Sequence, residues 1–174
     1  MMNSVLIAIR PQWVEKIASG EKTIEVRNTA PKEVPFKAYI YCTKEKKQDD
    51  IIWAGIFGDR GKWNGRVIGE FICDKVDMEI VGYINHEPCY WNLLLNGSCL
   101  TKDELMNYGK GKTLYGWHIS DLKIYGSPKE LSEFSRPCSY SGLCFSCKRT
   151  SFKKDGNLLC NTKITRPPAI VDVR

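Results

Sequence analysis

The sequence predicts an α+β domain built mainly of strands, with short helices between them and a small cysteine-rich tail. Apolar runs of strand length recur along residues 1–135, and helix-capping signals between them mark only short helices. Residues 136–174 instead gather half of the eight cysteines of the chain and much of its positive charge. We therefore predict two parts, a domain of residues 1–135 and a basic appendage of residues 136–174.

Length and composition exclude several other classes of protein. A chain of 174 residues suits one domain with a sizeable core plus an appendage. The hydrophobic fraction of 43% excludes a disordered protein, and no apolar run is long enough to span a bilayer. The first four residues lack the basic start and the cleavage site of a signal peptide, so we expect a cytoplasmic protein with no membrane partner.

Strands and helices alternate along the first part. An unbroken apolar run over residues 5–9 predicts a buried strand. Proline and apolar residues at helical spacing predict a helix over 10–18, which a glycine ends. In the alternating strand 36–42, Tyr39 and Tyr41 share one face, where we expect a satellite hydrophobic cluster or a cross-strand pair, the alternative being that they stack on a base. Further strands are predicted over 66–76, 113–120 and 122–125, and short helices over 101–109 and 128–134.

The densest group of opposite charges lies in residues 19–27, directly after the first predicted helix. Apolar and polar residues alternate there, so the strand should bury its apolar face and place Glu25 and Arg27 side by side on the other. Lys22 then stands at the mouth of the strand. The alternative is a solvated edge strand with an ion pair worth under about 1 kcal/mol.

Written with their spacing, these residues and the helix before them read Arg10-Pro11-x-Trp13 and then Gly20-x-Lys22-x-x-Glu25-x-Arg27. This pattern resembles the signature of the ASCH domain, a relative of the PUA domain. The resemblance covers about residues 4–134, and it implies a PUA-like mixed β-barrel whose cleft near the motif binds RNA or a modified nucleoside. The nucleic-acid-binding residues that it implies are Arg10, Trp13, Lys22, Glu25 and Arg27.

The same resemblance implies an alternative function. Some members of the family are amidohydrolases that act on an acylated nucleoside such as acylcytidine. They have Lys-x-x-Thr where this chain has Lys22-x-x-Glu25, so the hydroxyl nucleophile is absent. Thr23 or Thr43 would have to replace it, or a catalytic group would activate water. Nuclease activity follows only from the variety of the family.

Three residues are candidates for such catalysis, namely Lys22, Glu25 and Glu70. Glu70 follows a glycine within an apolar strand, where burial would raise its pKa and suit it to proton transfer if it faces the cleft. The alternative is a carboxylate that pairs with Lys22 or Arg27 and positions them.

Four cysteines of the appendage have a spacing typical of a metal site. They are Cys138, Cys144, Cys147 and Cys160, and the middle pair has the two-residue spacing of a zinc knuckle. We therefore predict a zinc-ribbon-like tail with Zn²⁺ as cofactor; disulfides, unpaired thiols and an iron–sulfur cluster are the alternatives. The other four cysteines (Cys42, Cys73, Cys89 and Cys99) are scattered like buried thiols of a reduced compartment.

The positive charge of the chain is concentrated in the same appendage. Residues 136–174 contain eight basic residues and two acidic ones, so their net charge equals the +6 of the whole chain. Such a segment attracts polyanions, although a basic tail can also serve solubility alone. A tail folded around zinc would hold four cations near one another, where they can bind phosphate. These are Lys148, Arg149, Lys153 and Lys154. The predicted partners are RNA or another nucleic acid, or a modified nucleoside.

Overall fold

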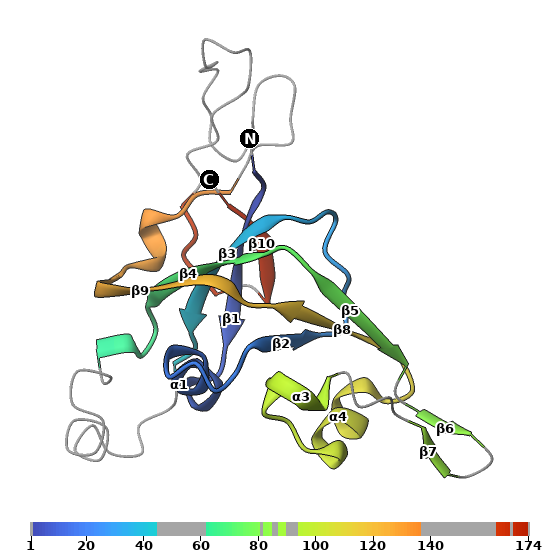
Figure 1. Cartoon of the computed structure of the whole chain (residues 1–174). Coiled ribbons are helices and arrows are strands. Elements are labelled where there is room, and N and C mark those ends of the chain that lie inside the picture. Colours follow the sequence, from blue (N-terminus) through green and yellow to red (C-terminus); the bar gives the residue numbers. More distant parts are fainter. Residues whose placement is uncertain are drawn as a thin grey trace.

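A computed structural model describes residues 2–44, 62–80, 82–84, 87–89, 94–136, 163–167 and 169–173; for 82–84 and 87–89 it describes the strand path alone. Its largest element is a five-stranded sheet (Figure 1). Across the sheet the strands follow the order β10 (Ile170–Asp172), β1 (Ser4–Ile9), β3 (Phe36–Cys42), β4 (Val67–Cys73) and β9 (Ser120–Lys129). β1 and β3 are parallel, and the other neighbours are antiparallel.

A second sheet has three strands and packs against the first. Its order is β2 (Ile24–Arg27), β8 (Thr113–His118) and β5 (Val76–Ile80). The short strands β6 (Gly82–Ile84) and β7 (Glu87–Cys89) form a hairpin of their own. We call the five-stranded and three-stranded sheets with their common core the barrel. The predicted α+β class, with mixed sheets and few short helices, is confirmed.

The helices are short and begin and end at recognisable signals. They are α1 (Pro11–Ala18), α3 (Leu95–Ser98), α4 (Lys102–Gly109) and the 3₁₀ turn η2 (Leu131–Glu133). α1 has proline in its first turn, and Gly20 follows it with φ +81°. Thr101 and Glu104 form the predicted capping box of α4. None of the described helices is long and apolar enough to cross a bilayer.

The main core lies between the two sheets. Phe36 of β3 meets Trp117 of β8 edge-on, with ring centroids 5.0 Å apart, and Ala38, Ile40 and Cys42 continue the same buried face. This face confirms the alternation predicted for residues 36–42. It joins the two sheets into one hydrophobic unit.

A second cluster covers the outer face of the five-stranded sheet. Tyr39 packs edge-on against Phe134 at 5.0 Å, and Tyr41 is 2% exposed in the same cluster. Of the interpretations of these tyrosines, the hydrophobic cluster is therefore the correct one. The helix predicted over 128–134 is shorter than expected, because Pro128 belongs to the end of β9 and only η2 is helical.

The carboxy-terminal residues return to the barrel. Ser135 and Lys163 form an antiparallel bridge, and Ile164 is buried in the second cluster. β10 then runs antiparallel to β1, and the Val173 N–H donates to the Ser4 carbonyl at 2.9 Å. Two stretches of the expected appendage, 163–167 and 169–173, thus lie against the barrel.

A third cluster attaches the helices α3 and α4 to β2. It contains Ile24 and Val26 of β2 together with Leu94, Leu105 and Leu114. α1 lies on the other side of β2, so this short strand runs between α1 and the pair α3–α4 (Figure 1). The charged motif therefore lies where two groups of helices meet the edge of the barrel.

Candidate functional site

The charged motif is almost entirely buried. Lys22 is 2% exposed, Glu25 7% and Arg27 9%. Glu25 and Arg27 lie side by side as predicted, but the alternative of a solvated edge strand is wrong. The apolar face of β2 is covered by the third cluster, while Glu25 and Arg27 lie opposite Trp117 and Tyr115 of β8.

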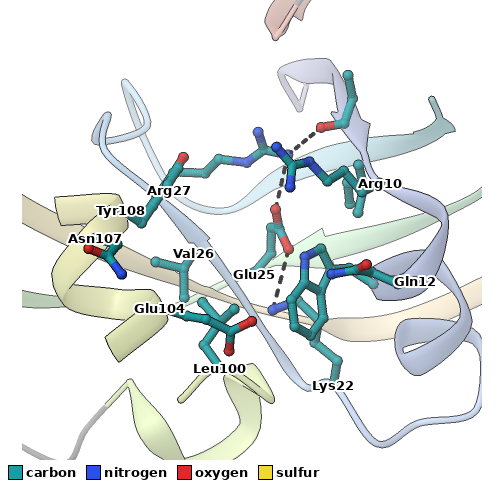
Figure 2. Close-up of a pocket in the computed structure, with 13 residues that line it drawn as sticks. Arg10, Gln12, Lys22, Glu25, Val26, Arg27, Leu100, Glu104, Asn107 and Tyr108 are labelled. Atoms are coloured by element: carbon teal, nitrogen blue, oxygen red, sulfur yellow. Dashed lines mark hydrogen bonds and ion pairs between the residues drawn. The ribbon is translucent and has the colours of Figure 1, made fainter. Parts of the chain in front are cut away.

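The three charges form one network, with Glu25 at its centre. Arg27 Nη2 lies 3.0 Å from Glu25 Oε1, and Lys22 Nζ lies 3.6 Å from Glu25 Oε2 (Figure 2). Two backbone carbonyls complete it, because Arg27 donates to Ala8 at 2.9 Å and Lys22 to Ser98 at 2.6 Å. Buried charges are tolerated only when paired and hydrogen-bonded in this way.

Lys22 has the least exposed of these charges. Its Nζ lies 5.4 Å from the centroid of the Trp13 ring, within the range of a cation–π contact. Burial lowers the pKa of Lys22 from its ordinary value of 10.5, although the negative charge of Glu25 acts in the opposite direction. The ammonium group thus loses its proton more readily than that of an exposed lysine.

The last residue of α3, Ser98, holds the carbonyl that Lys22 contacts. Gly97 has φ +88°, and its carbonyl accepts from the Thr23 N–H at 2.7 Å. A Cβ at this position would overlap the Thr23 hydroxyl, so only glycine allows this close approach. The close approach fixes the neighbouring Ser98 carbonyl over the Lys22 amine.

The network lies along one side of an open cleft of about 450 Å³. All five cleft residues that the sequence predicted line it, namely Arg10, Trp13, Lys22, Glu25 and Arg27. Figure 2 shows that the opposite wall comes from α4 and the segment just before it, with Leu100, Glu104, Asn107 and Tyr108. This wall and Gln12 of α1 were not predicted from the sequence. The capping box of residues 101–104 predicted α4, but nothing in the sequence indicated that this helix lies beside β2.

Glu70 lies elsewhere, and the structure overturns its predicted place in the cleft. Its Oε1 accepts from Lys37 at 2.9 Å and its Oε2 from the Tyr125 hydroxyl at 2.5 Å, and it is not among the residues that line the cleft. Burial alone would raise the pKa of Glu70, but the hydrogen bonds from Tyr125 and Lys37 lower it overall. The raised pKa predicted for Glu70 is therefore wrong, and so is the alternative that Glu70 pairs with Lys22 or Arg27.

The hydroxyl groups proposed to replace the missing nucleophile are also outside the cleft. Neither Thr23 nor Thr43 lines it, and among the described lining residues Tyr108 has the one hydroxyl group. The cleft therefore presents cations, amides and aromatic rings in place of a serine or threonine nucleophile.

The predicted residues of the tail all lie outside the described residues: Cys138, Cys144, Cys147, Cys160, Lys148, Arg149, Lys153 and Lys154. In the part of the chain that is described, no group of three or more histidine, cysteine, aspartate or glutamate side chains could hold a metal ion. Cys42 and Cys73 are buried thiols as expected, and burial raises the pKa of Cys73 to about 12. Cys99 is a free thiol of intermediate exposure.

Comparisons with known proteins find the same fold in solved structures. The ASCH protein from Zymomonas mobilis superimposes with a TM-score of 0.51 at 18% sequence identity, over 74% of this chain and 73% of that one. A single-residue variant of that protein gives the same TM-score and identity, over 74% of this chain and 76% of the other. No protein-family model matches the sequence, and no curated protein matches it. The chain has the ASCH-domain fold that its amino-terminal motif predicts.

Proposed function

We propose that the chain binds RNA or a related nucleic acid and that its cleft takes one nucleotide or base. The observation that carries this proposal is the buried Lys22–Glu25–Arg27 network along one side of an open cleft. Desolvating three charges is costly, and a hydrophobic group would fill the same space more cheaply. Such networks are typical of sites that recognise a polar ligand.

The walls of the cleft supply the other interactions that a base needs. Tyr108 is 45% exposed on α4 and offers a ring face for stacking. Gln12 and Asn107 line the cleft and carry amide groups, which both donate and accept hydrogen bonds at base edges. Arg27 and Lys22 donate to carbonyl or phosphate oxygens, and Glu25 holds both of them in place.

The test is the affinity of the full chain for a short single-stranded RNA, measured by fluorescence anisotropy. Tyr108→Ala should weaken binding by about 1–3 kcal/mol, the usual value of stacking one base. Met78→Ala is a matched control, because Met78 is 62% exposed on β5 and does not line the cleft. Unchanged affinity in a folded Tyr108→Ala variant would contradict the proposal that the cleft takes a nucleotide or base.

Arg27→Ala is a poorer test of the same idea. Arg27 is buried and pairs with Glu25, so its removal leaves that carboxylate with Lys22 as its remaining partner in the network. Loss of binding would then be confused with loss of stability.

We further propose that the tail binds Zn²⁺ through Cys138, Cys144, Cys147 and Cys160 and presents Lys148, Arg149, Lys153 and Lys154 to phosphate. The spacing of the cysteines supports the metal, and the charge of the segment supports a polyanion. Zinc content per chain should be about one equivalent. Cys144→Ser should abolish it, whereas Cys99→Ser, outside the tail, should not.

A second candidate function is hydrolysis of an amide on a modified nucleoside. One observation supports it, namely the buried Lys22 whose pKa is lowered, since a neutral amine can accept a proton from attacking water. In that reaction water adds its oxygen to the acyl carbon, the C–N bond breaks, and the base recovers its amino group. Release of cytidine from acylcytidine that Lys22→Met abolishes would support this function over binding alone.

A further inference from the structure

The cations of the cleft gather at the end where α1 begins. Arg10 is the residue directly before α1, and Arg27 ends β2. Figure 2 shows their side chains directed to the same end of the cleft, beyond Glu25 and away from Glu104. Two guanidinium groups at one end of a cleft repel each other unless an anion lies between them.

The acidic groups of the cleft are already engaged. Glu25 faces Arg27 with one carboxylate oxygen and Lys22 with the other. Glu104 Oε2 accepts from the Thr101 N–H at 2.8 Å and from the Thr101 hydroxyl at 3.1 Å, so it serves as the cap of α4. The cleft is thus lined by three cations and two carboxylates, and the Glu104 carboxylate is already occupied as the cap of α4 on the opposite wall.

The donors at this end are only partly used. Arg27 is 9% exposed, and its Nη2 contacts both Ala8 and Glu25, whereas its buried Nε has no hydrogen-bond partner within the described residues. Arg10 is exposed, and no hydrogen bond or ion pair of its side chain occurs among the described residues. An acceptor-rich group is therefore what this end of the cleft lacks.

The start of α1 adds to the same preference. No side chain caps this helix, and its first turn contains no acidic residue. The positive end of its dipole therefore lies beside Arg10 and is not neutralised by a carboxylate of its own first turn.

We infer that this end of the cleft, formed by Arg10, Arg27 and the start of α1, binds a phosphate group, and that the cleft takes a nucleoside monophosphate or the phosphorylated end of a strand. The inference rests on the proposed function and names the part of the ligand that is recognised. A volume of about 450 Å³ suits one nucleotide, with the phosphate at the α1 end and the base toward Tyr108. A dianionic phosphate supplies the acceptors that the two arginines require.

Isothermal titration calorimetry on the full chain tests this inference with three kinds of ligand. The ligands are the four nucleoside 5′-monophosphates, the four matching nucleosides and inorganic phosphate. We expect at least one nucleotide to bind about tenfold or more tightly than its nucleoside, because charge-assisted hydrogen bonds are the strong ones. Inorganic phosphate should bind more weakly than that nucleotide, since it makes no contact with the base wall.

The outcomes separate this inference from the proposed function. Equal affinity for nucleoside and nucleotide would overturn the phosphate site and leave base binding in place. Inorganic phosphate that binds as tightly as the nucleotide would overturn the assignment of a nucleotide. No binding of nucleosides, nucleotides or short RNA would overturn the proposed function itself.

Two charge-removing variants locate the phosphate within the molecule. Arg10→Ala should reduce nucleotide affinity at least about tenfold and nucleoside affinity far less. Lys123→Ala removes the same charge from an exposed position of β9, outside the cleft, and should leave both affinities within about twofold. Equal losses in the two variants would overturn the site, because they would reflect net charge alone.

Discussion

Glu25 Oε1 lies 3.0 Å from Arg27 Nη2 in a pair whose side chains are only about a tenth exposed. Both residues belong to a four-residue strand with helices on either side, so water has little access to either charge. The arrangement ties the stability of the domain to the residues that form its cleft.

Replacement of Glu25 by Gln should therefore destabilise the protein markedly. It leaves Lys22 and Arg27 buried without their carboxylate, and removal of one partner of a buried pair costs about 3–5 kcal/mol. Urea denaturation measures the change in the free energy of unfolding. The control is Glu21→Gln, which affects an exposed pair with Lys16 and should cost under about 1 kcal/mol. Equal effects in the two variants would mean that water screens the buried network as it does the surface pair.

The lowered pKa of Lys22 makes a separate prediction about alkaline pH. Between the folded pKa and the ordinary value of 10.5, the unfolded chain binds more protons at Lys22 than the folded one. The contribution of Lys22 to stability should therefore rise with pH in that window and level off above 10.5.

The measurement is the free energy of unfolding as a function of pH for the natural chain and Lys22→Met. The free energy of unfolding of the natural chain minus that of Lys22→Met should rise as the pH approaches 10.5. The exposed Lys112→Met variant corrects for the loss of one lysine. A difference that falls with rising pH would contradict burial as the dominant effect on Lys22.

Much of the fold could be predicted because its elements are encoded locally. The apolar run of β1, the alternation of β3 and the capping box of α4 each depend on residues within one segment. The same holds for Glu25 and Arg27, whose neighbouring positions follow from strand parity alone. These predictions needed no knowledge of what packs against each element.

The parts that sequence reasoning missed depend on partners distant in the chain. The burial of Glu25 depends on β8, which lies far from β2 in the chain and places the buried Trp117 opposite Glu25. The position of Glu70 in its strand did not predict its hydrogen bonds with Lys37 and Tyr125, which come from the two neighbouring strands. Pattern within a segment does not specify such a register between segments.

The Glu70 contacts lead to a prediction for acid conditions. Because the pKa of Glu70 is lowered in the folded protein, its contribution to stability is present above the ordinary value of 4.5 and is lost as pH falls through the folded pKa. The advantage of the natural chain over Glu70→Gln should therefore shrink with falling pH. Tyr125→Phe removes one of the hydrogen bonds responsible and should weaken this dependence without abolishing it. An advantage independent of pH would contradict the lowered pKa.

Two ways of removing the cysteine-rich segment, truncation at Phe134 and internal deletion of residues 137–162, should affect stability differently. A chain that ends at Phe134 also loses β10 and the buried Ile164 and Val173, which are 2% and 4% exposed. Each fully buried aliphatic side chain contributes about 1.5–3 kcal/mol. Such a truncation should therefore lower the free energy of unfolding by at least about 3 kcal/mol.

An internal deletion avoids this loss, because Ser135 and Lys163 are already paired across the segment. Replacing residues 137–162 by a short glycine-containing turn should leave the melting temperature, followed by circular dichroism, far closer to that of the natural chain than the truncation does. Equal destabilisation by both changes would mean that the segment itself supports the barrel. If the deletion variant is stable, its RNA affinity separates the two proposed binding elements. Retained affinity would assign binding to the cleft, and a loss that accompanies the loss of zinc would assign it to the tail.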